Sequence, residues 1–151
     1  MKRILVFDPG VTTGWCYCDG TGTYESGTFL KWLRIEALLA EYTPDLVVVE
    51  KFVLYPSAAQ HKIWSDFPTV EVIGVIRYLC GSKRIPMVLQ GANEVAQIKI
   101  TARLMSTPHE RDALRHAIKY YQGEKLHGPY RKYYTLRSSK RSANKRARNG
   151  T

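Results

Sequence analysis

Three acidic residues, Asp8, Glu50 and Asp112, are spaced along the chain so that they could meet in one site. Asp8 and Glu50 each follow an unbroken run of four apolar residues. Such runs are typical of strands buried on both faces, which puts each carboxylate at the tip of a central strand. Asp112 lies near the start of a predicted helix, with His109 one helical turn before it. If that helix packs across the strand ends, these side chains converge.

Converging carboxylates need a counter-charge, because partly buried anions repel one another. Oxygen ligands select hard divalent cations such as Mg²⁺ or Mn²⁺. Two such ions, about 4 Å apart, can activate a water and stabilise the leaving oxygen of a phosphodiester. The residues therefore predict a metal site that hydrolyses phosphodiesters.

The same residues also have plain structural interpretations. Asp8 opens an Asp-Pro-Gly sequence, which is a common turn. Glu110 lies about 200° around the helix from Asp112, so we assign it to helix capping and not to the site. His116 shares a helix face with His109 and Asp112, but a histidine packed in the core or lying at the surface would fit the same spacing.

The elements that must position these residues form an α/β pattern. Residues 4–30 favour three short strands separated by turns, and later segments alternate between helical and strand periods. We predict a mixed five-stranded sheet, with an antiparallel meander of the first three strands and two parallel strands, flanked by helices. The predicted order is strands at 4–7, 15–18 and 24–30, a helix at 31–42, a strand at 45–50, a helix at 69–80, a strand at 86–90, a mainly helical segment at 91–106 and a last helix at 107–123.

Two of the predicted helices carry further information. Residues 69–80 are apolar nearly all round, which predicts burial in the core or against another subunit. The last helix has a clear start, with Thr107 as the N-cap, Pro108 at the first helical position and Glu110 completing a capping box.

The charge is concentrated at the C-terminal end. The net charge is +10, and residues 124–151 hold nine Lys and Arg residues against one acidic residue, with tyrosines interleaved. This composition suits phosphate contacts and base stacking, although a solubilising tail is the alternative. We predict a nuclease domain at 1–123 and a basic tail at 124–151 that is disordered in the absence of DNA. The candidate nucleic-acid contacts in the tail are Lys125, Arg131 and Lys132.

Residues 51–68 have no clear period and place aromatic and basic side chains next to Glu50. This segment is a candidate substrate-contacting loop, although its aromatics would serve equally well to cover the sheet edge. The candidate nucleic-acid contacts outside the tail are Phe52, Tyr55, Lys62, Lys99 and Arg103.

Composition also excludes several classes of protein. No apolar run approaches the length of roughly 18 residues that a membrane span requires, and the N-terminal apolar run is too short for a signal peptide. The cysteines, Cys16, Cys18 and Cys80, form neither a disulfide framework nor a zinc-finger pattern. We therefore expect reduced thiols and a cytoplasmic protein, in a bacterial or phage-infected cell.

The motifs in their order resemble the RuvC family of Holliday-junction resolvases, within the ribonuclease H-like superfamily. The resemblance rests on Asp8-Pro9-Gly10, on Glu50 at the end of the fourth strand, and on His109-x-x-Asp112-Ala113-Leu114. It covers about residues 1–122, including a short basic segment at 95–99. The short chain suggests a phage-encoded version.

The resemblance implies a ribonuclease H-like fold and a site in which Asp8, Glu50 and Asp112 bind two Mg²⁺ or Mn²⁺ ions, with His109 as the fourth ligand. A neutral imidazole there could complete the metal site or move a proton. It also implies a homodimer, formed through the helix at 69–80, in which each subunit cuts one strand of a four-way DNA junction. The family's aromatic wedge after the glutamate would be Phe52 or Tyr55.

Other functions use similar residues. A ribonuclease H or a flap nuclease of the same fold would have the same ligands, and a non-catalytic nucleic-acid-binding module would have the same charge. A phosphate loop of the actin and sugar-kinase type could be built from residues 8–14, but those folds usually need two domains and this chain has room for one.

Overall fold

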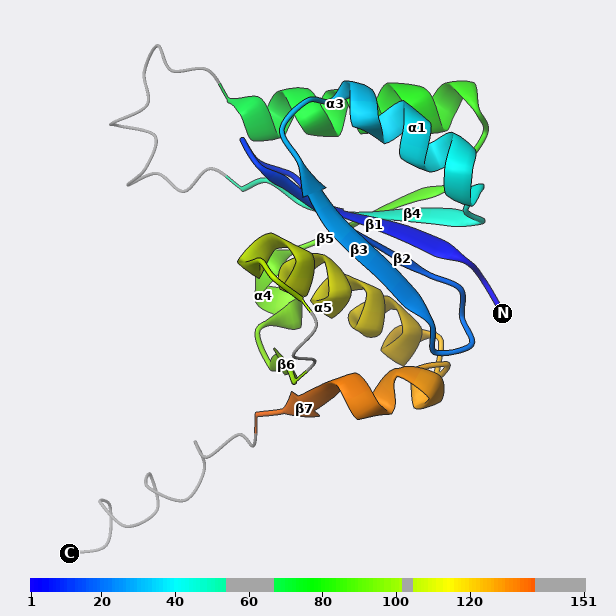
Figure 1. Ribbon diagram of the computed structural model, residues 1–151, viewed down its shortest axis with the longest axis vertical. Helices are drawn as coiled ribbons and strands as arrows, with labels where there is room; N and C mark the ends of the chain where they lie inside the picture. Colours follow the sequence, from blue (N-terminus) through cyan, green and yellow to red (C-terminus); the bar gives the residue numbers. More distant parts are fainter. Residues whose placement is uncertain (54–66, 102–104, 138–151) are drawn as a thin grey trace, which may run out of the picture.

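The computed structural model describes residues 1–53, 67–101 and 105–137. At its centre is a five-stranded sheet in the order β3-β2-β1-β4-β5 (Figure 1). β1 (Ile4–Asp8), β2 (Thr13–Cys18) and β3 (Tyr24–Phe29) form an antiparallel meander. β4 (Leu46–Glu50) pairs parallel to β1, and β5 (Met87–Gln90) pairs parallel to β4. The predicted mixed sheet is confirmed.

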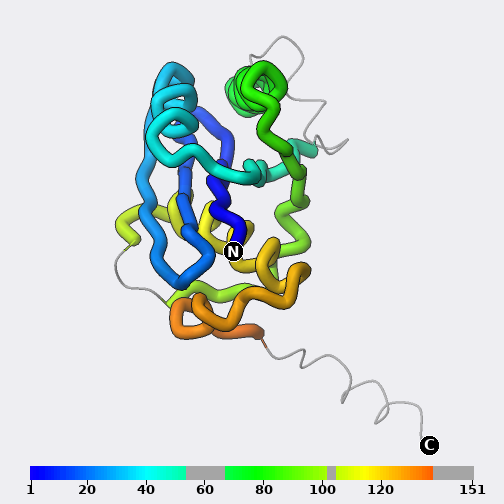
Figure 2. Tube along the Cα trace, turned by 90° about the vertical axis from the view of Figure 1, so that its right-hand side faces the viewer, coloured from blue at the N-terminus to red at the C-terminus, as the bar shows by residue number. Residues whose placement is uncertain are grey.

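Helices cover both faces of this sheet. α1 (Leu33–Tyr42) and α3 (Pro68–Ser82) lie on one face, and α5 (Pro108–Gly123) lies on the other (Figures 1 and 2). Each helix buries an apolar stripe against the strands, as the periodicity predicts. The sheet is therefore the middle layer of a helix–sheet–helix arrangement.

The alternation of side chains along β1 and β4 decides which residues face α5. On β1, Leu5 and Phe7 pack with α1 and α3, while Ile4 and Val6 pack with α5. Successive side chains on a strand point to opposite faces, so Asp8, two positions after Val6, belongs to the α5 face. The same alternation holds along β4, which directs Glu50 to that face as well.

The helical prediction for residues 91–106 is wrong for most of the described segment. Only α4 (Ala92–Val95) is helical, and it is followed by β6 (Ile98–Ile100). Ile98 is buried and Lys99 is exposed, which is the two-residue period of a strand and not the helical period.

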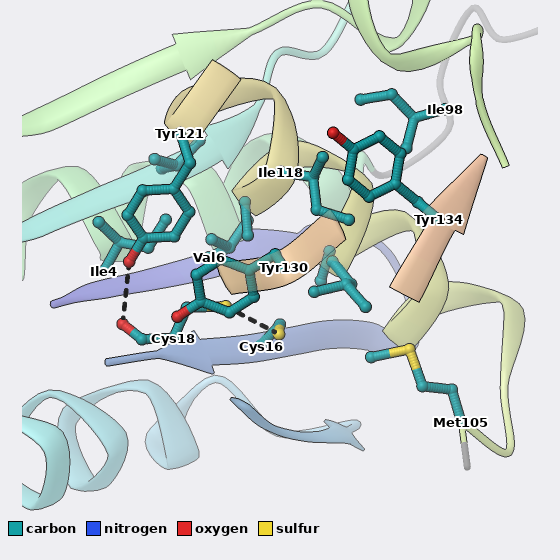
Figure 3. Close-up of a cluster of buried hydrophobic side chains, with 14 of the residues drawn as sticks. Ile4, Val6, Cys16, Cys18, Ile98, Met105, Ile118, Tyr121, Tyr130 and Tyr134 are labelled. Carbon is teal, nitrogen blue, oxygen red and sulfur yellow. Dashed lines mark hydrogen bonds between the residues drawn. The ribbon is translucent and has the colours of Figure 1, made fainter. Parts of the chain in front are cut away.

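The folded part of the chain continues beyond residue 123. After α5 come a 3-10 helix, η1 (Gly128–Tyr133), and a strand, β7 (Tyr134–Leu136), which pairs antiparallel with β6. Tyr130 and Tyr134 are buried, and the Tyr130 ring stacks on Tyr121 with their centroids 4.9 Å apart (Figure 3). Residues 124–137 are therefore folded and do not form the disordered tail that we expected. Tyr130 and Tyr134, which the composition assigned to base stacking, belong to the core.

α3 packs on the sheet through one side only, so burial of its outer side against another subunit stays a prediction. It buries Val72, Ile76 and Cys80 against the sheet, while Val70 and Tyr78 on its outer side are exposed. No helix among the described residues is long and apolar enough to cross a membrane. The three cysteines are free and buried.

Candidate active site

Three polar side chains end three neighbouring parallel strands at the same level. In the strand register Phe7 lies opposite Val49, and Glu50 lies opposite Gln90. Asp8 follows Phe7, so Asp8, Glu50 and Gln90 form a row at the carboxyl ends of β1, β4 and β5. This edge of an open α/β sheet is where such folds bind ligands.

The first turn of α5 is fixed by its cap. The Thr107 hydroxyl accepts a hydrogen bond from the Glu110 backbone N–H at 3.2 Å, and the Glu110 carboxylate accepts from the backbone N–H groups of Thr107 and Ser106. The capping box with Pro108 in the first turn is as predicted. Glu110 is thus occupied with the helix end and takes no part in the site.

A glycine lets α5 approach the sheet at this point. A Cβ atom built on Gly14 of β2 would lie 2.7 Å from the Cβ of His109 and would overlap the His109 carbonyl group. Any larger residue at position 14 would push the start of α5 away from β1 and β2. Gly14 therefore sets the distance between the helix face and the strand-end carboxylates.

One face of α5 carries the remaining site residues. His109 Nδ1 lies 3.0 Å from Asp8 Oδ2, and His116 Nε2 lies 2.8 Å from Glu50 Oε2. Asp112, between these histidines on the same face, forms an ion pair with Arg115. The structure thus brings both strand-end carboxylates against the predicted helix face, and it holds each of the three carboxylates in a pair with a neighbouring side chain.

The carboxylates also act on one another electrostatically. The pKa of Asp8 is raised to about 6, chiefly by burial and also by the charges of Glu50 and Asp112, although the hydrogen bond with His109 acts to lower it. The ionised form of Asp8 is therefore disfavoured in this arrangement. A bound cation would remove the penalty.

The donor set fits a hard divalent cation by its chemistry, since it combines three carboxylates with one imidazole. In their present pairs, however, no three His, Cys, Asp or Glu side chains of the described residues form a group that could hold a metal ion. Asp112 pairs with Arg115 through Oδ1, so Arg115 competes with an ion for this carboxylate.

The sequence pattern leaves the role of His116 open, and the prediction of site residues does not include Gln90, Arg115 or Gly14. His116 has no exposed surface and contacts Glu50 directly. Gln90 could have been found by the signal used for Asp8 and Glu50, because it is the polar residue that ends a predicted strand. Nothing in the sequence pattern marks the contact of Gly14 with the helix.

The predicted nucleic-acid contacts lie in different places. The Phe52 ring packs on Phe67. Phe52 and Glu50 both line a cavity of about 260 Å³. Lys99 is exposed on β6. Tyr55, Lys62 and Arg103 lie outside the described residues.

The predicted nucleic-acid contacts of the described residues after α5 begin at the far end of that helix. Lys125 follows the far end of α5, a helix of 16 residues whose length is about 24 Å, and it therefore lies well away from His109. Arg131 and Lys132 are exposed, with their charged groups 4.9 Å from the ring centroids of Tyr134 and Tyr133 respectively.

Comparison with known proteins supports the fold. No protein-family model and no curated protein sequence matches the chain. Among solved structures, T. thermophilus RuvC in complex with a Holliday junction substrate is similar with a TM-score of 0.63 and 14% identity, over 83% of this chain and 98% of that one. Another Thermus thermophilus RuvC structure is similar with a TM-score of 0.58 and 15% identity, over 82% and 97% of the two chains. The chain has a RuvC-like, ribonuclease H-like fold.

Proposed function

We propose that this protein is a divalent-metal-dependent endonuclease that cuts branched DNA and resolves four-way junctions by paired nicks. The observation that carries the proposal is the row formed by Asp8 and Glu50 at the ends of neighbouring strands, facing His109 and Asp112 across a distance fixed by Gly14. The solved T. thermophilus RuvC complex, which has the same fold and contains a Holliday junction, supports this class of substrate.

In this proposal Asp8, Glu50, Asp112 and His109 hold the metal. Divalent ions bound there would supply an activated water and stabilise the leaving oxygen. The protein's own part is to keep Asp8 at the strand tip, where His109 contacts one of its oxygens, and to hold Asp112 on the same helix face, beside Arg115. The carboxylates also argue against a module that only binds DNA, because unneutralised acids facing a phosphate repel it.

Affinity for DNA would come from the positive charge of the chain, which is +10 overall. Exposed Lys99, Arg131 and Lys132 would contact phosphates, and Phe52 beside Glu50 would contact bases near the cut. These contacts are expected to weaken steeply as salt is raised.

We also propose a homodimer through the outer side of α3, since two nicks on opposite strands need two sites. Tyr78 has 74% of its surface exposed and Trp32 has 53%. These two residues line an apolar groove of about 610 Å³ between α1 and α3. Exposed aromatic side chains around a groove are typical of an interface.

A comparison of substrates tests the proposed function. The purified protein is incubated with Mg²⁺ and a four-way junction, a three-way junction, a flap and an RNA–DNA hybrid of matched sequence. We expect cleavage of the four-way junction in preference to the others. Cleavage of the hybrid alone would identify a ribonuclease H, and binding without cleavage in any divalent ion would identify a binding module.

A further inference from the structure

We propose that His116 and Gln90 are positioning residues that hold Glu50 in the orientation needed to bind metal. This inference rests on the proposed function and adds two residues to its machinery. Neither residue belongs to the carboxylate set, and neither would touch the metal.

The three side chains form a connected chain of contacts from three elements. His116 Nε2 on α5 lies 2.8 Å from Glu50 Oε2 on β4, and His116 Nδ1 lies 3.0 Å from Gln90 Oε1 on β5. Glu50 and Gln90 are register partners on adjacent parallel strands, so both side chains reach the imidazole from the same face of the sheet.

The hydrogen-bond chemistry fixes one end of this chain. An ionised carboxylate can only accept, so the hydrogen lies on His116 Nε2 and points to Glu50. The Gln90 amide carries both an acceptor oxygen and a donor N–H group, so it can pair with Nδ1 whether or not that nitrogen bears a hydrogen. The ring is therefore held from both sides.

Burial makes the imidazole a support and not a ligand. None of the surface of His116 is exposed, and Gln90 is also buried, whereas the His109 side chain is 44% exposed. A buried polar side chain without partners is costly, and an aliphatic residue would fill this space without that cost. The presence of His116 and Gln90 at these positions is explained if their role is to keep the Glu50 side chain from rotating.

Glu50 would otherwise be free to turn. Its side chain has three rotatable torsions and is 26% exposed at the mouth of the site. With Oε2 held by His116, the other carboxylate oxygen is left to face a cation shared with Asp8. Outer contacts of this kind orient a ligand, and their loss typically lowers metal affinity by about 10–100-fold.

The test uses His116→Leu, which keeps volume and removes both hydrogen bonds, and His116→Gln, whose amide N–H can still donate to Glu50. Mg²⁺ affinity is measured by calorimetry without DNA, and junction cleavage is measured against Mg²⁺ concentration. For His116→Leu we expect a 10–100-fold weaker Mg²⁺ affinity, a lower kcat and an unchanged KM for the junction. His116→Gln should restore most of the affinity.

Tyr121→Phe is the matched control for loss of a buried hydrogen bond on the same helix. The Tyr121 hydroxyl donates to the Lys2 carbonyl at 2.8 Å, and its side chain is fully buried with no contact to Glu50. Tyr121→Phe should lower the melting temperature and leave Mg²⁺ affinity unchanged. An equal loss of affinity in Tyr121→Phe and His116→Leu would reduce His116 to a core residue and overturn the proposal.

Three further outcomes are decisive. Wild-type affinity in a folded His116→Leu variant would overturn the inference while leaving the nuclease intact. If His116→Leu does not fold, Gln90→Met decides, and unchanged Mg²⁺ affinity in that variant overturns the inference. A wild-type protein that binds no divalent ion and cuts no DNA refutes the proposed function, and the positioning role with it.

Discussion

Gly14 of β2 and His109 of α5 lie so close that a Cβ on the glycine would be 2.7 Å from the Cβ of the histidine. The start of the helix therefore rests directly on the strand next to β1. This contact lets His109 Nδ1 reach Asp8 Oδ2 at 3.0 Å, although 101 positions separate the two residues. The close approach of the two backbones brings the candidate site together, and the side-chain contacts depend on this approach.

Gly14→Ala should therefore damage both stability and the site. The added methyl group must displace α5, and overpacking of this kind costs about 1–3 kcal/mol. Urea denaturation measures the loss of stability, and calorimetry measures the loss of Mg²⁺ binding. Gly123→Ala, at the end of the same helix with nothing within 4 Å of its Cβ, should lower neither, and the helix propensity of alanine should raise stability slightly. Equal stability and Mg²⁺ affinity in Gly14→Ala and the wild type would contradict the assembly described above.

Asp8→Asn should stabilise the metal-free protein at neutral pH. Burial raises the pKa of Asp8 from 3.8 to about 6, so the folded state holds this proton more tightly than the unfolded chain. The wild type therefore loses stability as pH rises from about 4 to about 6, by about 1–2 kcal/mol after allowance for partial exposure. The variant lacks this loss.

Unfolding free energies of both proteins in EDTA, measured from pH 4 to pH 8, check this prediction. The difference between them cancels the groups that do not interact with Asp8. The difference in unfolding free energy should grow in favour of Asp8→Asn from about pH 4 to about pH 6 and then stay constant up to pH 8. A difference that does not change with pH would show that Asp8 titrates normally.

Arg115→Met should increase the affinity for Mg²⁺. Arg115 is the ion-pair partner of Asp112, so it would compete with a metal for that carboxylate. A partly exposed ion pair is worth about 1 kcal/mol, which corresponds to about a fivefold gain in affinity. Arg111→Met removes the same charge from the same helix, where the guanidinium contacts the Met105 carbonyl and pairs with no carboxylate of the described residues. It should change the affinity less, and equal gains would point to net charge alone.

Tyr78→Glu should produce monomers if the outer side of α3 is the dimer interface. A buried, unpaired carboxylate in an apolar contact is strongly unfavourable. Light scattering coupled to size exclusion gives the mass, and Leu136→Glu, at an exposed apolar residue on β7, is the control. A wild-type protein that is monomeric at micromolar concentration would refute the dimer.

The sequence was sufficient to predict the parts of the site that depend on strict local patterns. Unbroken apolar runs locate β1 and β4, and because they end in carboxylates they also locate Asp8 and Glu50. The capping signals before α5 fix the helix phase, which puts His109 and Asp112 on one face. Each of these inferences needs only residues near in sequence.

The remaining features depend on contacts between distant segments. The buried state of Tyr130 is set by Tyr121 and by the Gly20 N–H, which donates to its hydroxyl at 2.8 Å. Its basic neighbours in sequence are typical of a nucleic-acid-binding tail, so the sequence does not indicate that Tyr130 belongs to the core. The contact of Gln90 with His116 depends on the placement of β5 beside β4, and the ion pair of Arg115 depends on the direction of its side chain toward Asp112.

We propose above all that Asp8 and its partners make this protein a junction-resolving nuclease. The most direct measurement follows the cleavage of a four-way junction, labelled on each strand in turn, by the wild type and by Asp8→Asn with Mg²⁺. We predict paired nicks at symmetry-related positions by the wild type, and undiminished junction binding without nicks by Asp8→Asn. Full cleavage by Asp8→Asn, or no cleavage by the wild type, would contradict the claim.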